Sequence, residues 1–169
     1  GFSEPDHGSD LGNAQTRATR DGDEYVVNGS KIWTTMGNYA KYMIMLARTN
    51  PEAERKYDGL SFFLSPMQGD GIETRPIQKI TGEYGFTETF FTDARIPASC
   101  LIGGEGNGWK VAMQTLQYER SAAAGAAGVD EDLDAVDDRV VAGRGQLALA
   151  ALVDLHQAHT TRAVGLHRL

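Results

Sequence analysis

The spacing of hydrophobic residues changes near residue 103, and this change divides the chain into two parts of different predicted structure. Over residues 15–97, short apolar or alternating runs are separated by turn residues, which is typical of β-strands. From Trp109 onward, apolar residues recur at helical spacing. A glycine-rich stretch, residues 103–108, lies between the two patterns. The order predicts a β domain followed by helices.

The first part is predicted to form a compact β-sandwich or barrel. Asn28 and Gly29 lie between the runs 24–27 and 31–34, and Asn-Gly in this setting predicts a tight hairpin. Further strands are expected over residues 42–47, 60–64, 72–77 and 87–92. Pro76 places its strand at a sheet edge, because proline has no N–H to donate to the ladder. Roughly six or seven short strands are typical of a sandwich or barrel.

The second part is predicted to be helical. Apolar spacing predicts a helix over residues 109–127, and weaker helical patterns follow over 130–141 and 147–166. We therefore expect an α+β chain with a β domain over residues 1–102. Residues 103–169 are expected to be a partial, divergent helical domain.

Charge and cysteine content narrow the possible functions. The formal net charge is −7, which argues against binding to nucleic acid or to anionic membranes. Cys100 is the single cysteine, so no intrachain disulfide or cysteine zinc site can form. His156 and His159 have an HxxH spacing but lack a third ligand, and we assign no metal. The sequence shows no signal peptide and no membrane-spanning apolar run, so we expect a soluble, cytoplasmic protein.

Three stretches contain residues that could perform chemistry. The opening GFSEPDHGSD is rich in glycine, and its Ser3 and Ser9 hydroxyls could donate to phosphate oxygens. Trp33 is followed by two threonines and could flank a flat aromatic ligand. Glu119 and Arg120 lie in the predicted helix, where a carboxylate of raised pKa could act as a base. Each stretch also has a purely structural explanation. The opening stretch could be a connecting loop, Trp33 could be a core residue, and Glu119 and Arg120 could lie on a solvated helix face.

Four motifs resemble those of acyl-CoA dehydrogenases, in the order and at the spacing of that family. GFSEPDHGSD resembles T-E-P-x-A-G-S-D, and residues 28–35 resemble NG-x-K-x-W-I-T. Residues 90–97 are similar to F-x-D-x-x-V-P, and residues 106–113 to G-x-G-F/W-x-x-A-M. The resemblance covers residues 1 to about 128 and implies the middle β domain plus the first helix of a four-helix C-terminal domain.

The resemblance also implies FAD as cofactor, bound between these two domains. Such enzymes begin with a helical N-terminal domain, so we expect the chain to be a fragment that lacks this domain. By position, Phe2 and Ser3 are implied to touch the flavin ring, and Trp33 to lie beside it. Thr35 matches the hydroxyl that bonds flavin N5, while Thr34 replaces a usual isoleucine and is expected to add little.

The implied reaction is α,β-dehydrogenation of an acyl-CoA thioester, as in fatty-acid β-oxidation. A carboxylate removes an α proton while hydride passes to the flavin. Glu119 matches the base of the isovaleryl and long-chain branches, whereas most members carry the base later in the C-terminal domain. Arg120 is then implied to orient this base or the CoA portion of the substrate. Ser9 matches a position near both the FAD pyrophosphate and the thioester arm.

Two interpretations of this resemblance stay open. The parent protein is either an acyl-CoA dehydrogenase or a non-catalytic subunit that keeps the β domain without productive FAD binding. The first interpretation implies an electron-transfer flavoprotein as acceptor and a homo- or hetero-tetramer. In either case the 169-residue piece alone is expected to be inactive and to retain little FAD. The acyl chain is not indicated by the sequence.

Overall fold

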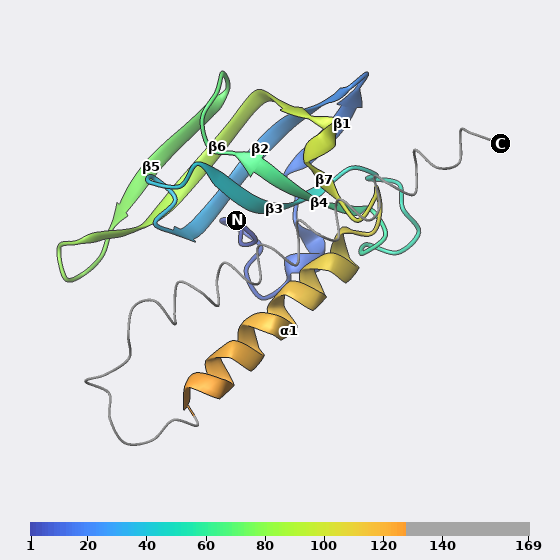
Figure 1. Cartoon of the computed structure of the whole chain (residues 1–169). Coiled ribbons are helices and arrows are strands. Elements are labelled where there is room, and N and C mark those ends of the chain that lie inside the picture. Colours follow the sequence, from blue (N-terminus) through green and yellow to red (C-terminus); the bar gives the residue numbers. More distant parts are fainter. Residues whose placement is uncertain (128–169) are drawn as a thin grey trace. The chain divides into compact units, whose positions relative to one another are not determined.

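The computed structural model describes residues 1–127, of which residues 121–127 are described by their backbone, and shows a seven-stranded sheet and one α-helix (Figure 1). The strands are β1 (Arg17–Asp21), β2 (Glu24–Thr35), β3 (Tyr42–Arg48), β4 (Leu60–Pro66), β5 (Ile72–Gln78), β6 (Tyr84–Pro97) and β7 (Leu101–Ile102). The helix α1 spans Gly108–Ala127. Two short 3₁₀ turns, Leu11–Asn13 and Ala98–Cys100, complete the described elements. The predicted change from strands to a helix is thus confirmed.

The described residues fall into two units, Gly1–Trp109 and a second that begins at Lys110. The predicted helices over 130–141 and 147–166 lie outside the described residues, as do His156 and His159. The domain boundary after residue 102 therefore stays a prediction. Among residues 1–127, no helix is long and apolar enough to cross a membrane.

The strands of the first unit form one mixed sheet in the order β5-β6-β2-β1-β3-β4-β7. Neighbouring strands are antiparallel except β1 and β3, which run parallel where Arg17 lies opposite Arg48. The sheet is strongly curved, and the long strands β2 and β6 run side by side through it (Figure 1). β5 is an edge strand, as the proline at position 76 predicts.

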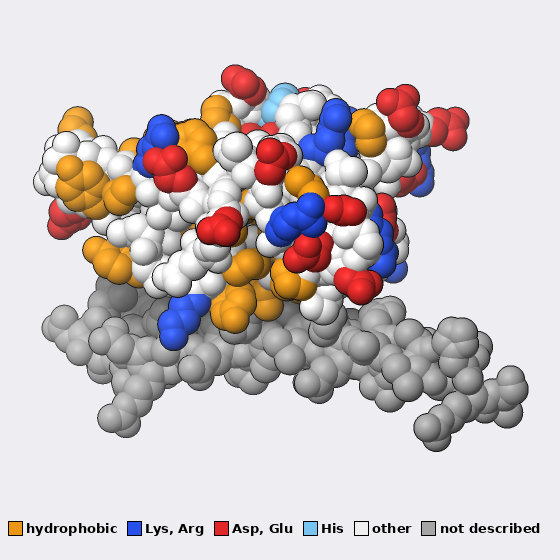
Figure 2. Space-filling view, turned by 90° about the horizontal axis from the view of Figure 1, so that it is seen from above, with side chains coloured by type: hydrophobic (Ala, Val, Ile, Leu, Met, Phe, Trp, Pro, Cys, Tyr) orange, Lys and Arg blue, Asp and Glu red, His pale blue; other side chains and the backbone are white. Residues whose placement is uncertain are grey.

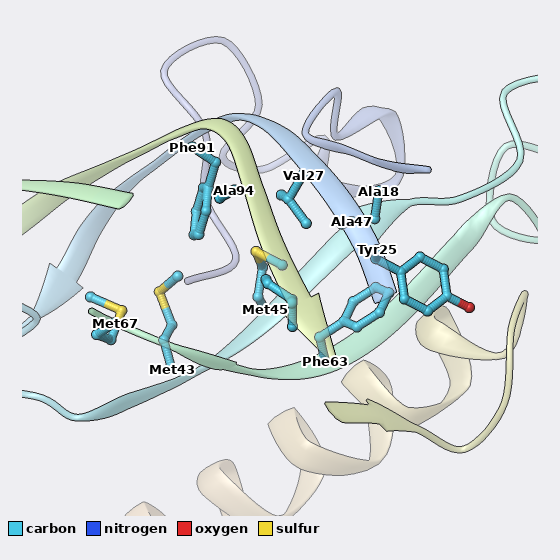
Figure 3. Packing of buried hydrophobic residues seen from close by; sticks show 11 residues of the cluster. Ala18, Tyr25, Val27, Met43, Met45, Ala47, Phe63, Met67, Phe91 and Ala94 are labelled. Carbon is cyan, nitrogen blue, oxygen red and sulfur yellow. The ribbon is translucent and has the colours of Figure 1, made fainter. Parts of the chain in front are cut away.

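One hydrophobic cluster fills the inner side of the curved sheet. It contains alternate residues of β2 and β3, as period-two side-chain alternation requires, together with residues of β1, β4 and β6 and Met67 just after β4 (Figure 3). Tyr25 and Phe63 meet edge to face, with ring centroids 5.0 Å apart. Both side chains are fully buried, as are Met45 and Val27. Burial of each large side chain contributes about 1.5–3 kcal/mol, so this cluster is the main source of stability of the first unit.

The predicted Asn28-Gly29 hairpin is wrong, because β2 continues through both residues without a turn. The chain reverses earlier, at Gly22 and Asp23, and Gly22 takes a φ of +61°. Asn28 and Gly29 instead form an irregularity in the ladder between β2 and β6. The Asn-Gly signal therefore marks a bulge in this sequence and not a chain reversal.

The bulge needs both of its residues for distinct reasons. Gly29 has a φ of +137°, and a Cβ at this position would lie 2.7 Å from the Thr16 Cα atom. Only glycine fits such a close backbone approach. Asn28 exchanges two hydrogen bonds with Asp93 of β6: its Nδ2 donates to Oδ1 at 3.0 Å, and its Oδ1 accepts from the Asp93 amide at 2.9 Å. The asparagine thus replaces ladder bonds that the bulge interrupts.

Arg48, at the end of β3, is a buried structural anchor for the segment before β1. Its guanidinium donates to the carbonyl oxygens of Ala14 at 3.0 Å, Gly12 at 2.9 Å and Lys56 at 3.1 Å. Three carbonyl acceptors satisfy a buried cation that would otherwise be costly. The arginine therefore fixes residues 12–14 against the sheet.

Exposed ion pairs add little to this framework. On the face shown in Figure 2, acidic and basic side chains lie next to one another. Arg95, for example, contacts Asp21 and Glu24, each at 2.9 Å, with more than half of its side chain exposed. Such exposed pairs contribute little to stability, because water and salt screen their charges. The fold is stabilised by its core and its buried polar contacts.

Two buried threonines of β6 provide a matched test of the polar contacts. The Thr87 hydroxyl accepts from the Asn38 amide at 3.0 Å and donates to the Asn38 side chain at 3.4 Å. The Thr89 hydroxyl is equally buried but has no hydrogen-bond partner among the described residues. An unpaired buried hydroxyl lowers stability, whereas a paired one does not.

We expect Thr87→Val to lower the free energy of unfolding by about 1 kcal/mol or more, because it leaves the Asn38 amide unpaired. Thr89→Val should leave this free energy unchanged or raise it by up to about 1 kcal/mol, since it removes an unsatisfied hydroxyl at nearly constant volume. Urea unfolding of the two variants measures the difference. Equal destabilisation by both would contradict the assignment and show that the Thr89 hydroxyl has a partner.

Candidate functional site

The opening loop, residues 1–10, lies along β2 near the end of that strand. The Ile32 amide donates to the Ser3 carbonyl at 2.9 Å, and Lys31 Nζ donates to the Phe2 carbonyl at 3.3 Å. The Phe2 ring also packs edge-on against Phe62 of β4, with centroids 5.8 Å apart. These contacts bring Phe2 and Ser3 next to the strand segment that leads to Trp33.

A buried ion pair between Glu4 and Lys31 holds this arrangement. Glu4 Oε1 lies 2.7 Å from Lys31 Nζ, and the lysine is completely buried while Glu4 is 6% exposed. The same carboxylate accepts from the backbone amides of Gln15 at 2.5 Å and Thr16 at 2.9 Å. Glu4 therefore ties together the opening loop, the segment before β1 and the middle of β2.

The buried environment shifts the pKa values of both partners. Burial disfavours the ammonium and lowers the pKa of Lys31, although the Glu4 charge opposes this. Burial alone would raise the pKa of Glu4, but the Lys31 charge and the hydrogen bonds outweigh it, so the pKa lies below its ordinary value. Glu4 is thus held as an anion, as an ion pair requires.

Trp33 stands out from the strand because β2 is irregular at this point. The register with β6 shifts between Lys31 and Thr34, and Trp33 takes a φ of +63°. A bulky residue in this left-handed region is a genuine outlier, and such outliers cluster at functional sites. The indole is 56% exposed and touches Phe86 edge-on, with centroids 6.1 Å apart. The alternative of a core tryptophan is therefore wrong.

The two threonines after Trp33 differ in their surroundings. Thr34 is half-buried, and its hydroxyl donates to Met43 Sδ at 3.7 Å, so its polar group is directed to the interior of the sheet. Thr35 is exposed at the end of β2. An exposed indole and an exposed hydroxyl on one strand end, with Ser3 on the adjacent loop, suit a flat heteroaromatic ring with a polar edge.

The other predicted site residues lie elsewhere. Ser9 is exposed in the opening loop. Glu119 and Arg120 lie on α1 and belong to the second unit, so their roles stay predictions. The sequence interpretation missed Glu4 and Lys31, although both belong to the motifs quoted above. A charged residue at a core-facing position of a strand was the available signal for Lys31.

The ion pair can be tested with a double-mutant cycle. We expect Glu4→Gln to cost about 3–5 kcal/mol of unfolding free energy, because it leaves a buried ammonium without its anion. Lys31→Met should cost less, since Glu4 keeps its two backbone amide donors. The double variant should be more stable than the sum of the single effects predicts, by about 2 kcal/mol. Urea unfolding measures all four proteins, and additive effects would contradict a direct coupling.

The pH dependence of the unfolding free energy provides the control for this double-mutant cycle. The stability contributed by the lowered Glu4 pKa is present above the ordinary value of 4.5 and is lost as the pH falls through the folded-state pKa. The wild type should therefore lose more stability than the double variant when the pH falls below 4.5.

Comparison with known proteins places these features in context. Residues 1–110 match the family model described as "Acyl-CoA dehydrogenase, middle domain". The chain is 46% identical to acyl-CoA dehydrogenase IpdE1 of Mycobacterium tuberculosis over 120 residues, which is 71% of this chain and 31% of the relative. The chain thus spans about a third of the length of this relative.

Two solved structures are similar in fold as well as in sequence. A variant of the Tcur3481-Tcur3483 steroid ACAD is 39% identical, with a TM-score of 0.65 over 71% of this chain and 31% of that chain. A glutaryl-CoA dehydrogenase from Mycobacterium smegmatis in complex with FADH2 is 34% identical, with a TM-score of 0.52 over 60% of this chain and 25% of that chain.

Proposed function

The chain belongs to the acyl-CoA dehydrogenase family, and we propose that the protein containing it is an FAD-dependent enzyme that dehydrogenates acyl-CoA thioesters at the α and β carbons. The observation that carries this proposal is the exposed Trp33 at a strained bulge, with Ser3 held on the adjacent loop. A similar structure bound to FADH2 supports the choice of flavin.

An exposed indole and an exposed hydroxyl at the end of β2 support a flavin ring as the ligand of the first unit. When bound, FAD supplies the acceptor for the hydride that leaves the substrate. Trp33 is proposed to lie beside the ring, and Phe2 is proposed to touch the ring from the opening loop. The Ser3 and Thr35 hydroxyls are proposed to bond the polar edge of the ring. Ser9 is proposed to lie near the pyrophosphate and the thioester arm.

Glu119 is proposed as the general base, with Arg120 orienting it or binding the CoA portion. Removal of the α proton requires an ionised carboxylate within hydrogen-bond reach of that proton. The proton would then reside on Glu119 while the hydride leaves the β carbon. The motif match at Glu119-Arg120 supports this assignment.

The substrate and partners are proposed at the level of class. Two of the similar proteins are named as a steroid ACAD and a glutaryl-CoA dehydrogenase, which supports an acyl-CoA substrate. The steroid enzyme is named for two components, which supports a multi-chain assembly. An electron-transfer flavoprotein is the proposed acceptor.

The proposal predicts that the full-length protein is yellow. We expect flavin absorption bands after purification, and bleaching of these bands when an acyl-CoA is added without oxygen. The panel comprises steroid side-chain, glutaryl and straight-chain CoA thioesters, with free CoA as the control. A colourless protein that binds no added FAD would contradict the proposal and favour a non-catalytic subunit.

A substitution tests the base separately. We expect Glu119→Gln to slow bleaching by about 10²–10⁴-fold, because general-base catalysis contributes a factor of that size. The FAD content should stay unchanged. Glu52→Gln, an exposed carboxylate between β3 and β4, is the control and should bleach at the wild-type rate. An unchanged rate in Glu119→Gln would place the base elsewhere.

A further inference from the structure

We propose that the Glu4–Lys31 pair is a positioning device that fixes Ser3 and Trp33 relative to each other, so that both meet one flavin ring at the same time. This inference rests on the proposed function. It assigns a role in cofactor geometry to two side chains that are themselves buried.

Three contacts join the opening loop, which carries Ser3, to the strand β2, which carries Trp33. Lys31 lies on β2 two residues before Trp33, and Glu4 follows Ser3 directly. The ammonium reaches Glu4 Oε1 at 2.7 Å and the Phe2 carbonyl at 3.3 Å. The Ile32 amide closes the same short segment through the Ser3 carbonyl at 2.9 Å. The loop and the strand are therefore linked at three points over adjacent residues.

The link lies where the strand departs from regular geometry. The β2–β6 register shifts immediately after Lys31, and Trp33 has a positive φ. Strained backbone persists only where its surroundings over-determine it. Lys31, fully buried on one side of the irregularity, supplies a fixed point from which Trp33 projects outward. Loss of this point would allow β2 to relax toward a regular strand.

The pair also carries no net charge, which suits a position next to a redox ring. A lone lysine or a lone carboxylate near the ring would bias one redox state of the flavin. A hydrogen-bonded pair supplies rigidity without that bias. Rigid supporting contacts of this kind determine whether a site is held within the small tolerance that catalysis needs.

The test uses the full-length protein with the double substitution Glu4→Gln and Lys31→Met, which removes both charges and approximates both shapes. After Glu4→Gln the side-chain oxygen can still accept from the Thr16 amide, which supports folding of the variant. Arg48→Met is the matched control, because it removes a second buried cation that holds a later part of the same segment. The protein is labelled with 5-fluorotryptophan, and Trp33→Phe assigns the ¹⁹F resonance of Trp33.

We expect the double variant to shift or broaden the Trp33 resonance in the apoprotein. Its kcat per bound flavin should fall by about 10²-fold, because misplacement by about 1 Å costs that much, while KM for the acyl-CoA changes little. Arg48→Met should lower stability but leave the resonance and the kcat per flavin unchanged. A purely structural pair would behave like this control.

The inference is overturned if the double variant keeps the wild-type Trp33 resonance and a kcat per flavin within about twofold, a change well below that expected for misplacement. Failure of the proposed function is seen separately, as a wild type that binds no FAD or whose bound flavin is bleached by none of the acyl-CoA thioesters. In that case the ¹⁹F comparison in apoprotein still decides whether the pair positions Trp33.

Discussion

A buried carboxylate–ammonium contact organises the first unit of this chain. Two charges removed from water are costly unless their geometry is good and their remaining hydrogen bonds are satisfied. Glu4 meets this condition with Lys31 and two backbone amides. Since Glu4 and these partners come from three separate segments, the contact converts a polar, glycine-rich opening loop into a fixed part of the sheet.

The consequences extend from this contact to the exposed surface. With the loop fixed against β2, the strand irregularity that follows Lys31 presents Trp33 outward with a positive φ. The hydrophobic cluster inside the sheet provides the stability that such strain needs. The proposed flavin site is thus a small exposed region supported by buried contacts directly beneath it.

Much of the fold could be predicted because it depends on local patterns. The strands at 42–47 and 60–64, the edge strand with Pro76 and the helix from residue 109 each follow from periodicity or from proline's missing donor. The Asn28-Gly29 hairpin could not be excluded locally. What prevents a turn there is the approach of Thr16 and the pairing of Asn28 with a distant residue of β6.

The site was predictable in part and for a different reason. Motif resemblance indicated Ser3, Trp33 and Thr35, but no periodicity connects Glu4 with Lys31, which lie 27 residues apart. Pairing of two distant charges depends on the folded register and is not visible in either local sequence. Glu119 belongs to the second unit, so its relation to Trp33 stays a prediction.

The central claim is that the Glu4–Lys31 pair holds the opening loop on β2. Amide hydrogen exchange at Ile32 tests it most directly, because this amide donates to the Ser3 carbonyl. The account predicts slow exchange at Ile32 in the wild type and fast exchange in the Glu4→Gln, Lys31→Met protein, with Val26 in the same strand equally protected in both. Unchanged protection at Ile32 in the double variant would contradict it.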